Sequence, residues 1–77
     1  GGLADIAVAP MPGTVFSVAV EPGQAVARGA ALMVIESMKL QTTISAGRDG
    51  VVQTVHFAAD QTFDRGAVLV TLEAEGA

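Results

Sequence analysis

Hydrophobic residues along the chain occur in short runs that dense turn signals separate. Gly and Pro mark the boundaries, at Pro12-Gly13, Pro22-Gly23, Gly29, Gly47, Asp49-Gly50 and Gly66. The runs between them are rich in Val, Ile, Thr and Phe, which is the composition of β-strands rather than of helices. The pattern therefore predicts an all-β chain of short strands.

The two halves of the sequence repeat each other at a spacing of 37 residues. Residues 13–36 and 50–73 are identical at nine of 24 aligned positions. The identities are Gly13/Gly50, Val15/Val52, Val18/Val55, Gln24/Gln61, Arg28/Arg65, Gly29/Gly66, Ala30/Ala67, Leu32/Leu69 and Glu36/Glu73. Two similar halves packed face to face predict a pseudo-twofold axis and two sheets around one core.

The first strand of each half is expected to be irregular. Its apolar positions are Val15, Val18 and Val20 in the first half, and Val52, Val55 and Phe57 in the second. The spacing of three and then two breaks strict alternation, which predicts a bulge or a strong twist.

The rest of each half follows the same plan in both copies. A brief bridge is expected near Val26 or Phe63, and then a turn at Gly29 or Gly66, where glycine takes a positive φ at no steric cost. Each half then ends in a second strand, Ala31–Ser37 or Val68–Glu73.

The segment Ala30–Ala46 has a competing interpretation as a helix. It lacks Gly and Pro, and Leu32, Ile35 and Met38 recur at helical spacing. The run Thr42-Thr43-Ile44 is a poor helix former, however, and the start of the segment repeats a stretch too short and too β-branched for a helix. We therefore predict strand, hairpin and strand here, and eight strands, two facing sheets and no helix in all.

The repeat also predicts where the joint between the halves lies. Under the 37-residue shift, Lys39 falls onto Gly2 in one direction and onto Gly76 in the other. The joint thus corresponds to the chain ends and should lie at the opposite end of the sandwich. We take residues 5–75 as the domain and residues 1–4 as a linker or as residues added for expression.

Length and composition narrow the class of protein. A chain of 77 residues supports one small domain, which makes a deep enzymatic cleft an unexpected feature. The net charge of -4 disfavours nucleic acid and membrane as partners. Cysteine is absent, which excludes disulfides and thiolate metal sites and is compatible with a reducing compartment. The longest apolar run, Ala30–Ile35, is far shorter than a membrane span, and no signal-peptide pattern is visible.

Lys39 is the only lysine of the chain, and every other base is arginine. The ordinary role of a lysine is a solvated surface charge. This one, however, lies where the first half passes to the second, between the large apolar residues Met38 and Leu40. A primary amine, unlike a guanidinium, can lose its proton and attack an activated acyl group. The position therefore predicts an amine at a hairpin tip that is suited to acylation.

Four blocks of sequence resemble the biotinyl domain of biotin-dependent carboxylases. They are Ala9-Pro10-Met11-Pro12-Gly13, Val20-Glu21-Pro22-Gly23-Gln24-Ala25-Val26, Ile35-Glu36-Ser37-Met38-Lys39-Leu40 and Gly50-Val51-Val52, and they occur in the family's order and spacing. The resemblance covers roughly residues 5–73. The usual core of that family is Glu-Ala-Met-Lys-Met, from which this chain departs at Ser37 and Leu40. Nothing resembles the extra "thumb" loop of some bacterial acetyl-CoA carboxylase carriers.

The resemblance implies a fold and a function. The fold is a flattened barrel, or sandwich, of two four-stranded antiparallel sheets. A biotin protein ligase would attach biotin to Lys39, recognising it through Glu36, Met38 and Leu40. The domain would then carry a carboxyl group from a biotin carboxylase to a carboxyltransferase, most simply in an acyl-CoA carboxylase, with pyruvate and urea carboxylases open. It would have no catalytic residue or metal of its own, and would be cytoplasmic, or in the mitochondrial matrix of a eukaryote.

Met38 and Leu40 have an alternative role as ordinary core residues. In the recognition hypothesis they flank the lysine at the surface instead. A two-residue tip of Met38 and Lys39 requires positive φ without Gly or Asn, against the usual hairpin preference. We therefore predict mild backbone strain at the tip, as is found at functional sites.

Other candidate residues and functions are weaker. His56 has no second His or Cys for a metal and is expected on a strand surface, while Asp60 and Asp64 lack the ligand density of a calcium loop. Glu73 repeats Glu36, which favours a structural or solvated role. The alternative functions are a lipoyl carrier of a 2-oxo acid dehydrogenase, which usually has Asp before and Ala after the lysine, and an unmodified structural adaptor.

Overall fold

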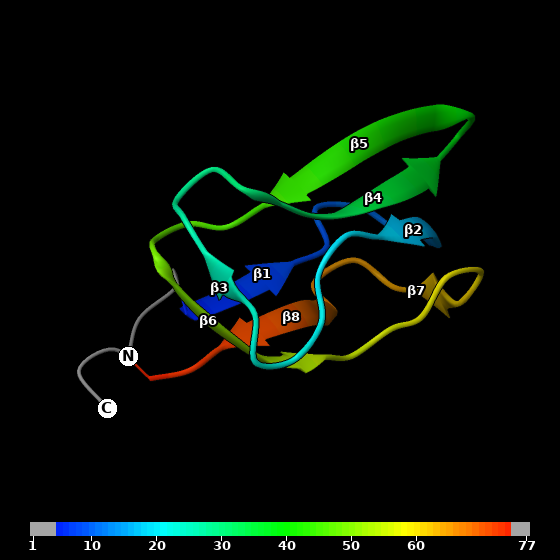
Figure 1. Cartoon of the computed structure of the whole chain (residues 1–77). Coiled ribbons are helices and arrows are strands. Elements are labelled where there is room, and N and C mark those ends of the chain that lie inside the picture. Colours follow the sequence, from blue (N-terminus) through cyan, green and yellow to red (C-terminus); the bar gives the residue numbers. More distant parts are fainter. Residues whose placement is uncertain (1–4, 75–77) are drawn as a thin grey trace.

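The computed structural model describes residues 5–74 of the chain. This range contains eight short β-strands joined by turns and loops (Figure 1). They are β1 (Ile6–Val8), β2 (Gly13–Val18), β3 (Ala25–Val26), β4 (Ala31–Ser37), β5 (Leu40–Ser45), β6 (Gly50–Val55), β7 (Thr62–Phe63) and β8 (Val68–Leu72). No helix occurs in this range, so the predicted all-β class is confirmed. The segment with the competing helical interpretation forms the hairpin of β4 and β5.

The strands form two four-stranded antiparallel sheets, with orders β1-β8-β6-β3 and β5-β4-β2-β7. The 37-residue shift exchanges the two orders position by position, since β2 corresponds to β6, β4 to β8, β3 to β7 and β5 to β1. The short strands β3 and β7 each pair with the long strand of the other half. The predicted pseudo-twofold sandwich is therefore confirmed, and the crossed short strands bind the halves into one fold.

Both halves supply the core in matched pairs. Val15 and its mate Val52 are completely buried, as is Leu69, and its mate Leu32 is nearly so. The other buried apolar residues are Ala9, Val20, Val26, Met33, Ile35, Ile44, Ala46, Phe63, Val70 and Leu72. Burying one Val, Leu, Ile, Phe or Met side chain contributes about 1.5–3 kcal/mol. No polar or charged side chain is buried in the described range, so the interior between the sheets is held by apolar packing.

The irregular features predicted from the repeat are present in both halves. The register of β2 against β4 shifts just after Val15, and that of β6 against β8 shifts just after Val52. These are the bulges that the broken alternation predicted. Gly29 and Gly66 both have a φ of 85°, which confirms the left-handed turns expected there.

The two ends of the sandwich are occupied differently. In Figure 1 the tip of the β4–β5 hairpin lies at the upper right, whereas the start of β1 and the end of β8 lie at the lower left. The joint between the halves therefore lies opposite the start of the first strand and the end of the last one, as the repeat predicted. Residues 1–4, predicted as a linker, and Glu75, the predicted last residue of the domain, lie outside the described residues. Between residues 5 and 74 no helix has the length and apolar character needed to cross a membrane.

Candidate site of covalent modification

The β4–β5 hairpin reaches beyond the apolar core. Ile35 is the last fully buried residue of β4. Past it the ladder between β4 and β5 continues through two more pairs, Glu36 with Gln41 and Ser37 with Leu40. On its other side, β4 has its last partner in β2 opposite Glu36. The final turn of the hairpin is therefore paired along its own two strands only.

Met38 and Lys39 form the two-residue turn at the tip. Their φ angles are 52° and 69°, so both lie in the left-handed region that side chains other than Gly, Asn and Asp rarely adopt. A type I′ hairpin turn requires positive φ at both central positions, because its twist matches that of the flanking strands. The predicted strain at the tip is confirmed. It costs about 1–2 kcal/mol for each residue, which packing elsewhere must offset.

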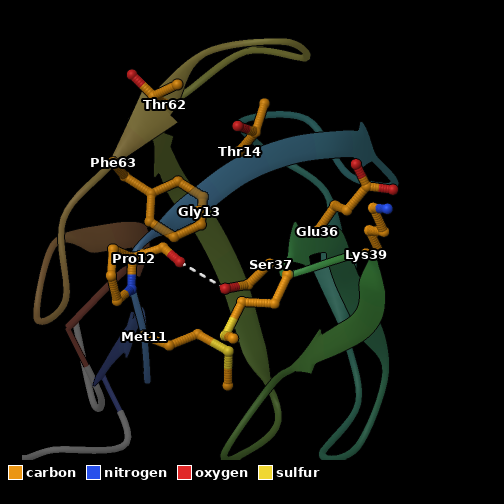
Figure 2. Close-up of a pocket in the computed structure, with 10 residues that line it drawn as sticks. Met11, Pro12, Gly13, Thr14, Glu36, Ser37, Lys39, Thr62 and Phe63 are labelled. Carbon is orange, nitrogen blue, oxygen red and sulfur yellow. Dashed lines mark hydrogen bonds between the residues drawn. The ribbon is translucent and has the colours of Figure 1, made fainter.

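The amine of Lys39 is exposed and makes no hydrogen bond or ion pair with the residues that the structure describes. Glu36 lies on the same side of the hairpin in Figure 2, but no ion pair joins the two side chains. The amine is thus held clear of the fold, as the sequence predicted. An activated acyl group can reach it without any contact being broken first.

The two residues that flank the lysine are exposed apolar side chains. Met38 is 92% exposed and Leu40 is 72% exposed, the two highest values among the large apolar residues of the described range. The alternative interpretation as core residues is therefore wrong for both. Glu36 is also exposed, on the outer face of the hairpin opposite Gln41. The four residues predicted for modification and recognition lie together at one tip.

A shallow open depression of about 630 Å³ adjoins the tip, between the hairpin and the loop that enters β2. Its lining residues are Met11, Pro12, Gly13, Thr14, Glu36, Ser37, Met38, Lys39, Thr62 and Phe63. Figure 2 shows Phe63 across the depression from Lys39, and the hydrogen bond from Ser37 to Pro12 beside it. Sequence reasoning did not place this loop against the tip, although the similarity to the family at Ala9–Gly13 and the repeated Gly13 were signals for it.

Comparison with known proteins identifies the family of this chain. Residues 7–72 match the protein family described as biotin-requiring enzyme. The chain belongs to this family. The prediction of a biotinyl carrier domain, made from the four sequence blocks, is therefore confirmed.

Named relatives of this biotin-requiring enzyme domain are parts of larger proteins. The chain is 50% identical over 64 residues to the mitochondrial propionyl-CoA carboxylase alpha chain of Homo sapiens, covering 83% of this chain and 9% of that one. It is 41% identical over 64 residues to the biotin carboxyl carrier protein of Streptococcus mutans, covering 83% of this chain and 49% of that one. The chain thus spans less than a tenth of the human relative and about half of the bacterial one.

The fold of the biotin-requiring enzyme domain is shared with a lipoyl domain. The solution structure of the lipoyl domain from the 2-oxoglutarate dehydrogenase complex of Azotobacter vinelandii has a TM-score of 0.74 and 31% sequence identity to this chain. The match covers 84% of this chain and 82% of that domain. The two domains therefore share one scaffold.

The remaining polar residues of the domain do not form a second centre. No group of three or more His, Asp or Glu side chains is arranged to hold a metal ion within residues 5–74. His56 lies exposed just after β6, where its Nε2 is 2.8 Å from the Oγ1 of Thr71. Asp60 and Asp64 are exposed turn residues. The chemistry that the described residues support is nucleophilic attack by one primary amine.

Proposed function

We propose that Lys39 carries covalently attached biotin, and that the domain transports a carboxyl group from a biotin carboxylase site to a carboxyltransferase site. The observation that carries the proposal is a free, exposed amine at the strained tip of the β4–β5 hairpin. The parent enzyme is an acyl-CoA carboxylase, a choice supported by 50% identity to a propionyl-CoA carboxylase chain. Attached biotin supplies a ring nitrogen that accepts and releases the carboxyl group.

The residues of the tip fit the attachment reaction. The Nζ atom of Lys39 attacks the acyl carbon of a biotinyl adenylate, an amide bond forms, and the bond from that carbon to AMP breaks. The amine gives up a proton to solvent, and AMP leaves. The domain needs no general base of its own, because the ligase activates the acyl group and the exposed amine is already positioned. After attachment, tethering raises the effective concentration of biotin at both carboxylase sites.

Glu36, Met38 and Leu40 are proposed to be the residues that a biotin protein ligase recognises. Two exposed apolar side chains on either side of the lysine have no packing role in the domain itself. Their burial in a complex would remove apolar area from water and so favour binding. Other partners would be the biotin carboxylase and the carboxyltransferase. The proposed compartment is the cytoplasm, or the mitochondrial matrix in a eukaryote, in line with the human relative.

The decisive experiment is intact-mass measurement after incubation with purified biotin protein ligase, biotin and ATP. We expect one biotinyl group on the wild-type chain and none on Lys39→Arg, because a guanidinium is a poor nucleophile. Lipoate with a lipoyl ligase serves as the matched alternative, and preferential lipoylation would replace the proposed function with that of a lipoyl carrier. Absence of both adducts would favour a structural adaptor instead.

The same assay tests recognition by the apolar flanks. Met38→Ala and Leu40→Ala should slow biotinylation at least several-fold without lowering Tm, because neither side chain is buried. Val8→Ala, which truncates another exposed apolar residue on β1, is the control and should biotinylate normally. Normal rates for both tip variants would assign recognition to other residues.

A further inference from the structure

One side-chain hydrogen bond fastens the modified hairpin to the rest of the domain. The Oγ of Ser37 donates to the carbonyl oxygen of Pro12 at 2.8 Å, across 25 positions of sequence. Within residues 5–74 no other side-chain hydrogen bond involves residues 36–42. Figure 2 shows the bond at the base of the tip, beside the open depression.

Gly13 is the reason that the two segments come close enough for this bond. A β-carbon at Gly13 would lie 2.5 Å from the backbone oxygen of Glu36 and 3.3 Å from the Cβ of Ser37. The loop that enters β2 therefore lies directly against the backbone of β4, just where the pairing of β2 with β4 ends. The carbonyl of Pro12 then faces the last residue of β4, and the serine hydroxyl is its donor.

The position of the bond matters because the next two residues are strained. Met38 and Lys39 both have positive φ, and the pair of Ser37 with Leu40 is the last pair of the ladder before this turn. Exposed backbone bonds at such an end open readily. The hydrogen bond of Ser37 opposes this opening from the core side of the hairpin, where Ile35 is also buried.

We propose that Ser37 is a positioning residue for the modification of Lys39, and that its bond to Pro12 holds the tip in the conformation that the ligase binds. This inference rests on the proposed function. A ligase that binds only the ordered tip has an apparent affinity reduced by the fraction of domains in which the tip is ordered. Ser37 therefore acts on binding of the domain to the ligase and leaves the transfer of the acyl group unchanged.

The test is steady-state biotinylation with the full chain as the varied substrate. Ser37→Ala should raise KM by up to roughly two- to fivefold at unchanged kcat, because losing one net hydrogen bond lowers the ratio of ordered to open tips by about that factor and KM follows the ordered fraction. Amide hydrogen exchange at Ser37 and Leu40, the last pair of the ladder, should accelerate by up to the same factor, while core amides of β2 and β6 stay protected. Ser37→Thr, which keeps a hydroxyl and suits a strand, should restore both values.

Ser45→Ala is the matched control, since Ser45 is an exposed residue of the same hairpin with no side-chain hydrogen bond to the described residues. It should behave as wild type. Unchanged KM and exchange in Ser37→Ala, with a normally biotinylated wild type, would overturn the role of Ser37 alone. A fall in kcat at constant KM would also overturn it. A wild-type chain that accepts no biotin would instead defeat the proposed function.

Discussion

The two ends of the sandwich have corresponding residues in the repeat, but different interactions stabilise them. Met11, Pro12 and Gly13 correspond to Arg48, Asp49 and Gly50 under the 37-residue shift. At the end near β1 and β8, the guanidinium of Arg48 makes four hydrogen bonds. Two go from Nε and Nη2 to Oδ1 of Asp5, at 2.9 and 2.8 Å, one to the carbonyl of Glu73 at 2.6 Å and one to the carbonyl of Asp49 at 2.9 Å.

We call this set of Arg48 hydrogen bonds the clamp. The hairpin end has no corresponding set among the described residues. Met11, the counterpart of Arg48, is 37% exposed and lines the open depression beside Lys39. One neutral hydrogen bond, from Ser37, closes this end instead. The acidic residue of the tip, Glu36, makes no ion pair with Lys39, so the amine stays free. Charge pairing is thus found at the end near β1 and β8, whereas the proposed site of modification has none among the described residues.

The largest expected effect comes from filling the two corresponding glycines. We expect Gly13→Ala to lower the free energy of unfolding by about 3 kcal/mol, because the new methyl group meets the backbone oxygen of Glu36, which cannot move without shifting β4. Urea denaturation measures the change. The hairpin should also be displaced, so biotinylation of any folded Gly13→Ala protein should be slower.

Gly50→Ala is the matched variant at the other end, and its cost should have a different origin. A β-carbon there meets Nη1 of Arg48, a side-chain atom that can swing away, and only an ordinary contact at 3.5 Å with Leu72. The loss should therefore equal that of the Arg48 hydrogen bonds, and biotinylation should be normal. A larger loss of stability in Gly50→Ala than in Gly13→Ala would contradict the comparison.

Removal of the clamp itself should have the next largest effect. The side chains of Arg48 and Asp5 are 14% and 17% exposed, so their ion pair is largely shielded from solvent. Arg48→Ala should cost about 2 kcal/mol, the range for hydrogen bonds to charged groups, and lower Tm by roughly 8–16 °C. Arg65→Ala, which truncates an exposed arginine, is the control and should leave Tm nearly unchanged.

A double mutant sharpens this prediction. If Gly50→Ala acts by displacing Arg48, it should cost almost nothing further in the Arg48→Ala background, which is strong non-additivity between neighbours. Additive losses would show that the methyl group strains the backbone directly. The rate of biotinylation below Tm should match wild type in Gly50→Ala, Arg48→Ala and the double mutant, because Arg48 bonds to residues beside the start of β1 and the end of β8, opposite the tip of the β4–β5 hairpin (Figure 1).

The sequence predicted the strands and the exposed hairpin tip. It predicted neither the hydrogen bonds of Arg48 at one end nor the bond of Ser37 to Pro12 at the other. The strands, bulges and glycine turns were predictable because the same local patterns occur in both halves of the repeat. The hairpin tip was predictable because a unique lysine lies there between two apolar residues. The partners of Arg48 and Ser37 are 25 or more positions away, except for the adjacent Asp49. Such contacts depend on how loops meet after folding. Local sequence patterns do not indicate which loops will meet. Gly13 and Gly50, which permit the close approach, are the exceptions.

The smallest expected effect concerns the turns that precede β3 and β7, where the halves again differ. Gly23 and Asp60 are repeat mates with φ of 90° and 73°, and their amides bond to the carbonyls of Val52 and Val15 at 2.7 and 2.8 Å. The backbone is the same, but glycine takes a positive φ at no steric cost, whereas aspartate only tolerates it better than most residues. Asp60→Gly should relieve the left-handed strain of about 1–2 kcal/mol and lose part of the gain to the greater freedom of unfolded glycine.

The net result for Asp60→Gly should be a stabilisation of about 0.5 kcal/mol, and the reverse exchange, Gly23→Asp, should destabilise by a similar amount. Denaturant midpoints at constant m-value measure both changes. Because Asp60 does not line the depression beside the tip and its side chain is exposed, biotinylation should not change in either variant. Destabilisation by Asp60→Gly would mean that the aspartate side chain stabilises its own turn, so that this difference between the halves is an adaptation and not a tolerated defect.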